Sequence, residues 1–125
     1  MTAATAPAVT VEGRENAAVL HLHTDLDAAL APRLRELLAD AIDRHARVVI
    51  DLAEVPTVGP EGLAVLVRAH RRARRQGGWV CFAAPSRFVL TVLHTMHVDG
   101  VFPIFDDCGS ALRWLLSPAA PPPPD

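Results

Sequence analysis

The sequence is poor in the residues that build redox and metal sites. Its two cysteines, Cys81 and Cys108, are not spaced as a CxxC pair, and Cys81 lies inside the apolar run WVCFA, which is typical of a structural thiol. His94 and His97 are one helical turn apart, but neither an HExxH motif nor a cysteine cluster accompanies them. We therefore expect no metal, no cofactor and no redox role.

Long apolar runs and an excess of one charge are also missing. No apolar stretch approaches the ~20 residues that a membrane helix needs, and the N-terminal MTAATAPAV lacks the positive start of a signal peptide. The 12 basic residues nearly balance the 14 acidic ones, and the net charge of -2 gives no overall field that would hold a nucleic acid. These absences predict a cytoplasmic protein with no membrane insertion and no nucleic-acid partner.

The signatures of common enzymes are absent as well. The sequence has no glycine-rich phosphate loop, no GxSxG motif and no Cys/His nucleophile pairing. We therefore expect no enzymatic activity and no catalytic residues. A degenerate enzyme or a small-ligand domain is an alternative that rests on analogy of fold alone.

Arginines crowd the end of one predicted helix, where positive charge complements the helix dipole. A solvated helix face explains them, and contact with RNA or with a partner's acidic patch is the alternative. The arginines are Arg68, Arg71, Arg72, Arg74 and Arg75.

Apolar patterns predict the element order β-β-α-β-α-β-α-β-α. Residues 17–24 alternate, so this strand is expected to be half-buried, with His21 and His23 facing solvent. Residues 48–52 are apolar without alternation, as in a central strand covered on both faces, and Pro103 places the last strand at a sheet edge. The expected strands are 9–11, 17–24, 48–52, 79–83 and 101–105, and the expected helices run from 29–31 to 45, from 60 to 76, from a cap at Ser86 to a stop at Gly100, and from 110 to 116.

Strands that alternate with helices imply parallel crossover connections. The order therefore predicts an α/β fold, a single domain with a mixed, mostly parallel sheet of about five strands and about four helices. The domain is expected at residues 8–116, after a flexible N-terminus at 1–7 and before a Pro-rich disordered tail at 117–125.

The segment PTVGPEGLAVLV, residues 56–67, follows a predicted buried strand and starts a helix. Gly59 is expected to take a turn conformation that other residues avoid, Pro60 has the φ angle of a first helical residue, and Glu61 places negative charge at the helix N-terminus. In a parallel sheet the loop after a central strand lies at the carboxyl ends of the strands, where binding sites collect. This turn is the candidate binding surface, although a good helix start would also explain it.

Two segments resemble the STAS family of anti-sigma factor antagonists, whose signatures read G-E-L-D and D-L-S-x-V-x-x-I-D-S-S-G-L. Thr24-Asp25-Leu26-Asp27 is similar to the first signature, and VVIDLAEVPTVGPEGLAVLVRA is similar to the second. The resemblance covers about residues 8–116 and implies a STAS-like fold. The matching positions are Leu26, Asp27, Asp51, Leu52, Val55, Val58, Gly62 and Leu63.

In that family the domain docks on a serine-kinase-type anti-sigma factor and frees a sigma factor. The kinase then phosphorylates the first serine of D-S-S-G and undoes the contact. The resemblance implies an anti-sigma factor as partner and leaves a homodimer open. An accessory or scaffold subunit of a larger assembly, such as a stressosome or a lipid-transport ABC ATPase, is the alternative. The partner-binding residues that it implies are Asp27, Thr57, Val58, Gly59, Pro60, Glu61, Gly62 and Leu63.

The sequence departs from the family at the phosphorylated position. Gly59 stands in place of the aspartate, Pro60 in place of the phosphorylated serine, and Glu61 in place of the second hydroxyl residue. Glu61 could imitate phosphate and lock the protein off. However, a carboxylate carries about half the charge of a phosphate and lies one residue later, about 100° around the helix axis. We therefore favour an antagonist that is locked on because Pro60 cannot be phosphorylated, and we do not expect Thr57, the one nearby hydroxyl, to replace it.

Overall fold

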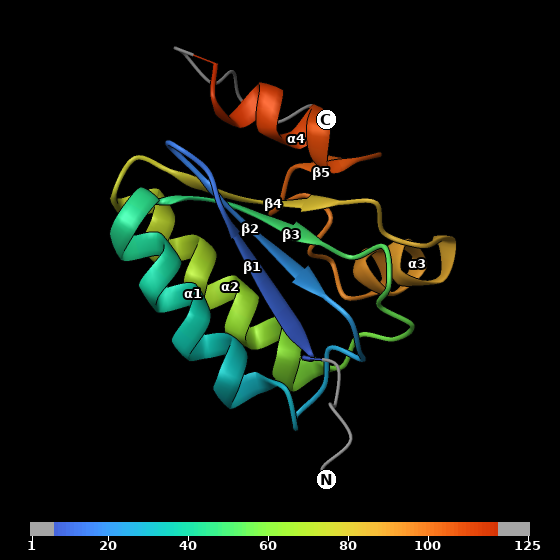
Figure 1. Cartoon of the computed structure of the whole chain (residues 1–125). Coiled ribbons are helices and arrows are strands. Elements are labelled where there is room, and N and C mark those ends of the chain that lie inside the picture. Colours follow the sequence, from blue (N-terminus) through green and yellow to red (C-terminus); the bar gives the residue numbers. More distant parts are fainter. Residues whose placement is uncertain (1–6, 118–125) are drawn as a thin grey trace, which may run out of the picture.

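A computed structural model describes residues 7–117 of the chain, so the expectations for the two ends of the chain fall almost wholly outside the described residues. The described part contains five strands and four helices (Figure 1). The strands are β1 (Val9–Gly13), β2 (Ala18–Leu22), β3 (Arg47–Asp51), β4 (Trp79–Ala83) and β5 (Ile104–Phe105). The helices are α1 (Ala31–His45), α2 (Pro60–Arg75), α3 (Arg87–Thr95) and α4 (Cys108–Leu115).

The strands form one mixed sheet in the order β1-β2-β3-β4-β5. The hairpin pair β1–β2 is antiparallel, and every later pair is parallel. The predicted element order and the mostly parallel α/β fold are therefore confirmed. Strand β3 lies in the centre of the sheet, between β2 and β4. Because these three strands are parallel, the loop that follows β3 lies at their carboxyl ends, as predicted.

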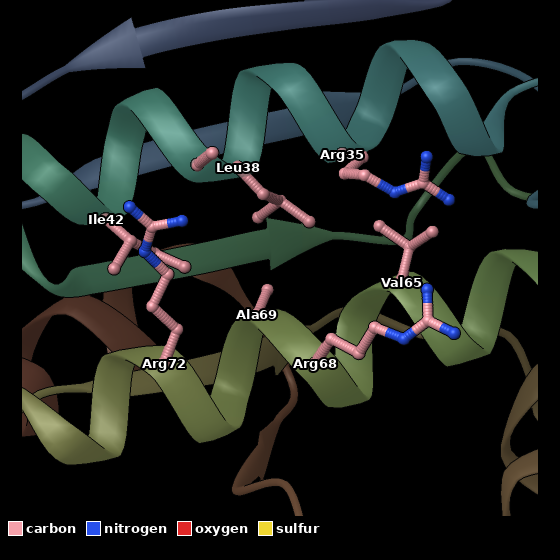
Figure 2. A pocket seen from close by; sticks show the side chains of 8 residues that line it. Arg35, Leu38, Ile42, Val65, Arg68, Ala69 and Arg72 are labelled. Atoms are coloured by element: carbon pink, nitrogen blue, oxygen red, sulfur yellow. The ribbon is translucent and has the colours of Figure 1, made fainter.

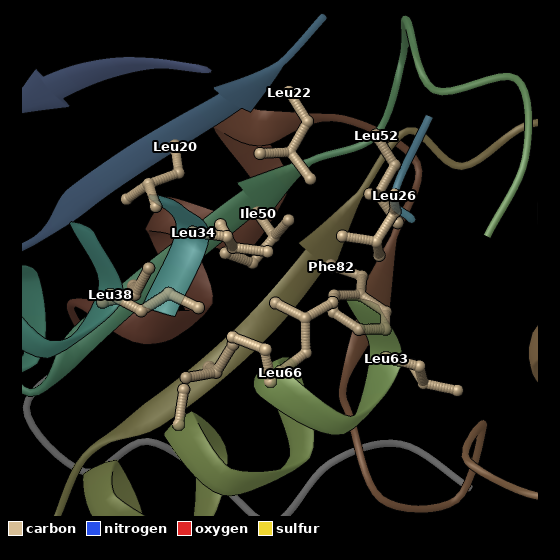
Figure 3. Packing of buried hydrophobic residues seen from close by; sticks show 14 of the residues in the cluster. Leu20, Leu22, Leu26, Leu34, Leu38, Ile50, Leu52, Leu63, Leu66 and Phe82 are labelled. Carbon is tan, nitrogen blue, oxygen red and sulfur yellow. The ribbon is translucent and has the colours of Figure 1, made fainter. Parts of the chain in front are cut away.

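Two layers of helices cover the two faces of the sheet (Figure 1). On one face α1 and α2 pack side by side over the larger apolar cluster, to which Leu20, Ile50 and Phe82 contribute from three adjacent strands (Figure 3). On the other face α4 packs on β3, β4 and β5 over a smaller cluster. Burying one large apolar side chain contributes about 1.5 to 3 kcal/mol, so both layers contribute to stability.

The second helical layer overturns the prediction that strand 17–24 is half-buried. Val19 lies on the face opposite Leu20 and is 1% exposed, because it belongs to the cluster beneath α4. Ala17 is buried in the same cluster. The alternating pattern correctly indicates that this face of the strand becomes polar at His21. It does not indicate that α4 covers the residues before His21.

The segment after α3 also differs from the prediction. The cap at Ser86 is confirmed, since its Oγ accepts a hydrogen bond from Val89 N at 3.1 Å. The helix ends at Thr95, well before Gly100, because His97 adopts the left-handed conformation with φ at 59°. The last strand is shorter than predicted, since Phe102 turns inward and stacks on Phe82 with ring centroids 4.3 Å apart. Its edge position is confirmed.

His70, on α2, gives the larger core a pH dependence. It is 6% exposed and lies between Trp79 and Phe102, with ring centroids 5.7 and 5.0 Å away. Burial lowers the pKa of His70 to about 4, and the nearby Arg74 guanidinium adds to the effect. The unfolded chain therefore binds a proton at this side chain between pH 6.5 and 4 that the folded protein does not bind. This contribution to stability is complete above pH 6.5 and is lost as the pH falls toward 4.

We expect His70→Leu to remove this pH dependence. Between pH 7 and pH 4.5 the native protein should lose about 2 kcal/mol more unfolding free energy than the variant does. Urea unfolding of both proteins at the two pH values measures the difference, and all other titrating groups are shared between them. Equal losses in the two proteins would contradict the assignment.

Candidate functional site

A short parallel bridge joins the loop after β3 to the segment before α1. Leu26 pairs with Val58, and Leu26 N donates to the Thr57 carbonyl at 2.9 Å while Gly59 N donates to the Leu26 carbonyl at 2.7 Å. Thr57 Oγ1 also donates to Asp25 Oδ1 at 2.8 Å. The two segments that carry the family resemblance therefore form one surface at the carboxyl end of the sheet.

Asp27 lies in this surface and holds the turn that leads into α1. Its Oδ1 accepts a hydrogen bond from Leu30 N at 3.0 Å, and its carbonyl accepts one from Ala31 N at 3.1 Å. Its Cα would lie 3.9 Å from a Cβ built on Gly59, so the structure brings these two predicted site residues together. Asp25 is part of the same surface through Thr57, and no local sequence signal predicts it as a site residue.

The start of α2 is confirmed at Pro60, but the reason given for Gly59 is wrong. Gly59 has φ −106° and ψ 166°, an extended conformation that any residue adopts. A Cβ built on Gly59 would meet nothing closer than the Leu26 carbonyl at 3.6 Å, which is ordinary contact. Gly59 is the N-cap residue and supplies no side-chain cap, and Pro60 and Glu61 follow it on the exposed side of the first turn.

Gly62 is the glycine that this site requires. A Cβ built there would lie 2.7 Å from both Cγ and the carbonyl oxygen of Leu26, closer than real contacts allow. The missing side chain lets the first turn of α2 press against Leu26, whose own side chain is 1% exposed (Figure 3). Gly62 thereby sets the distance between the two segments of the surface.

Burial divides the predicted partner-binding residues into two groups. Val58, Gly62 and Leu63 are buried and shape the surface from below. The residues that a partner could touch are exposed or half-buried. We call them the docking surface: Asp27, Thr57, Gly59, Pro60 and Glu61.

We expect Gly62→Ala to destabilise the protein by about 1 to 3 kcal/mol, the usual cost of forcing an extra group into a packed contact. The matched control is Gly59→Ser, for which the structure has space and which adds a capping hydroxyl, so its stability should rise by a few tenths of a kcal/mol. Urea unfolding measures both changes. If Gly62→Ala were as stable as the native protein, the close approach to Leu26 would not be a constraint.

The arginines of α2 are divided between structural contacts and a groove. Arg72 Nη2 contacts Asp43 Oδ1 of α1 at 2.6 Å, and the Arg74 guanidinium lies over the Trp79 ring, 3.8 Å from its centroid. A groove of about 200 Å³ runs between α1 and α2, with apolar side chains on its floor and arginines along its rim (Figure 2). It is lined by Arg35, Leu38, Ala39, Ile42, Val65, Arg68, Ala69 and Arg72. Arg72 thus pairs with α1 and also lines the groove, Arg74 packs on Trp79, and Arg68 stands at the groove.

The expectation that His21 and His23 face solvent is also corrected. Both side chains are half-buried, and each contacts a carboxylate, His21 contacting Asp51 and His23 contacting Glu54. Burial lowers the pKa of His21, but its hydrogen bonds to Asp51 and Glu12 outweigh burial, so the pKa is raised. The alternating pattern correctly places both histidines on one face of the strand. It does not predict the carboxylates that contact them, because Asp51 and Glu54 come from β3 and the loop after it.

Comparison with known families matches residues 8–111 to the STAS domain. The chain therefore belongs to the STAS family, which confirms the resemblance seen in its two motifs. No curated protein matches the chain significantly. Within residues 7–117, no helix has both the length and the apolar character needed to cross a membrane.

Solved structures share the fold over nearly the whole chain. An anti-sigma factor antagonist from Mycobacterium paratuberculosis is 23% identical with a TM-score of 0.78, and the alignment covers 87% of this chain and 93% of that one. A STAS domain protein from Planctomyces limnophilus is 22% identical with a TM-score of 0.77, covering 86% and 96%. The anti-sigma factor antagonist SpoIIAA, in its unphosphorylated form, is 17% identical with a TM-score of 0.74, covering 84% and 93%. At these identities the likeness establishes the fold.

Proposed function

We propose that this protein is a non-catalytic anti-sigma factor antagonist, which regulates transcription by binding a serine-kinase-type anti-sigma factor through the docking surface. The observation that carries the proposal is the bridge between Leu26 and Val58, which assembles both family motifs into one exposed surface. Solved proteins of the same fold that are named as anti-sigma factor antagonists support it. Such a protein acts by competition for its partner, so its effect follows mass action.

We further propose that the antagonist is independent of phosphorylation. Pro60, which has no hydroxyl, occupies the first turn of α2 where the family carries its phosphorylated serine. The Thr57 hydroxyl lies before the helix cap and donates its hydrogen bond to Asp25 at 2.8 Å. A kinase would have to break that contact to reach Thr57. Residues 59–62 carry no hydroxyl, and the exposed Thr57 hydroxyl is engaged by Asp25.

The position of Glu61 favours a protein that is locked on. Its Oε2 would lie 3.8 Å from a Cβ on Gly59, so the carboxylate folds back over the N-terminal end of α2. Negative charge in the first helical turn stabilises a helix by about 0.3 to 1 kcal/mol. A phosphate adds about twice the charge of a carboxylate, and its oxygens would stand at residue 60. Glu61 thus acts on its own helix and imitates phosphate poorly.

The proposal is tested by titrating the purified serine-kinase-type anti-sigma factors of the source organism into the native protein. We expect one of them to bind and Pro60→Arg to weaken its affinity at least about tenfold, equivalent to about 1.4 kcal/mol, because Pro60 is an exposed residue of the docking surface. The matched control is Asn16→Arg, which adds the same charge in the exposed β1–β2 turn, at the opposite end of β2. Its affinity should equal that of the native protein.

Two results would contradict the proposal. Failure of every anti-sigma factor to bind the native protein would exclude this partner class. Equal affinities of Pro60→Arg and Asn16→Arg would place the contact elsewhere on the molecule. Isothermal titration calorimetry provides both measurements.

A further inference from the structure

Three side chains of the types that can ligate metal ions meet on the sheet face that α4 covers. His21 of β2, Asp51 of β3 and Cys108 of α4 each place one ligand atom so that all three atoms lie within 4.8 Å of one another. Adjacent parallel strands bring the first two together, because His21 and Asp51 are register partners. Cys108 arrives from the first turn of α4. All three side chains are half-buried, so the cluster is enclosed and still within reach of solvent.

Two of these side chains are oriented by groups outside the cluster. His21 Nδ1 lies 2.6 Å from Asp51 Oδ2, while its other nitrogen, Nε2, lies 3.1 Å from Glu12 Oε1 of β1. The second oxygen of Asp51, Oδ1, accepts a hydrogen bond from Ala53 N at 3.0 Å. His21 and Asp51 therefore each have one polar atom in a hydrogen bond to a group outside the cluster, and one polar atom directed into the cluster. A carboxylate bound to the far nitrogen of a histidine is the usual way to orient a metal-ligating imidazole.

The charges of the cluster favour a cation. Glu12 and Asp51 supply two carboxylates for one imidazole, and Arg14 pairs with Glu12. Cys108 would bind a divalent cation as the thiolate, because a coordinating thiol loses its proton.

We propose that His21, Asp51 and Cys108 bind one divalent transition-metal ion of the zinc class, and that Glu12 is a positioning residue for His21. A set of one imidazole, one thiolate and one carboxylate suits Zn²⁺, whereas Mg²⁺ and Ca²⁺ prefer oxygen ligands alone. Tetrahedral Zn²⁺ holds such ligand atoms about 3.3 to 3.6 Å apart. Binding widens the 2.6 Å contact between His21 and Asp51 and draws the Cys108 sulfur inward, movements that side-chain rotation supplies. Water completes the coordination, and the ion joins β2, β3 and α4.

Cobalt substitution tests the site in the full chain, prepared without a histidine tag. Titration with Co²⁺ should give a near-ultraviolet sulfur-to-cobalt charge-transfer band that saturates at one ion per chain, and Zn²⁺ should displace it. Cys108→Ser should abolish the band. Cys81→Ala should keep the band, since Cys81 is fully buried in β4 and is not one of the three proposed ligands. Circular dichroism confirms that the variants are folded.

Glu12→Gln tests the positioning role separately. We expect it to lower Zn²⁺ affinity by about 10- to 100-fold, as removal of a ligand's hydrogen-bond partner does in other sites. Glu15→Gln removes the same charge from an exposed position in the same hairpin and should leave the affinity unchanged. Absence of the cobalt band, or a band that persists in Cys108→Ser, would show that His21 and Asp51 form a hydrogen-bonded pair and nothing more. Equal affinities of the two glutamate variants would remove Glu12 from the proposal.

Discussion

The arrangement of the candidate site depends on the backbone bridge between Leu26 and Val58. Its two hydrogen bonds, at 2.9 and 2.7 Å, hold the loop after β3 against the segment before α1. The Leu26 side chain is buried, and the bare Cα of Gly62 lets α2 begin in direct contact with it. The starts of α1 and α2 are therefore fixed relative to each other before any partner arrives. A surface held in this way loses little conformational entropy on binding.

Most of the fold could be predicted because each element carries a local signal, such as the apolar run of β3 or the Pro60 start of α2. The cover that α4 gives to Val19 could not, because it depends on packing between segments far apart in the sequence. The same holds for the site. The turn at residues 56–67 was singled out from its own residues, whereas the contact of Thr57 with Asp25 spans 32 residues and has no local signal.

The two proposed sites share β3, since the metal site lies on the sheet face that α4 covers and the docking surface lies beyond the carboxyl end of the strand. Its apolar residues Val48 and Ile50 face the larger core, while Val49 and Asp51 face the layer of α4. The loop that follows Asp51 carries the docking surface. The metal proposal concerns contacts among β2, β3 and α4, and the docking proposal concerns the bridge at Leu26. Each can therefore fail without the other.

If the docking surface acts as proposed, an antagonist without a phosphoacceptor at residue 60 cannot be switched off by its partner's kinase. The most direct measurement follows the release of sigma factor from its complex with the cognate anti-sigma factor, with and without ATP. The native protein should release sigma equally in both conditions, whereas Pro60→Ser combined with Glu61→Ser should lose its effect as ATP is consumed. Reversal of release by ATP in the native protein, with stoichiometric phosphate on Thr57 in phosphopeptide mapping, would contradict phosphorylation independence.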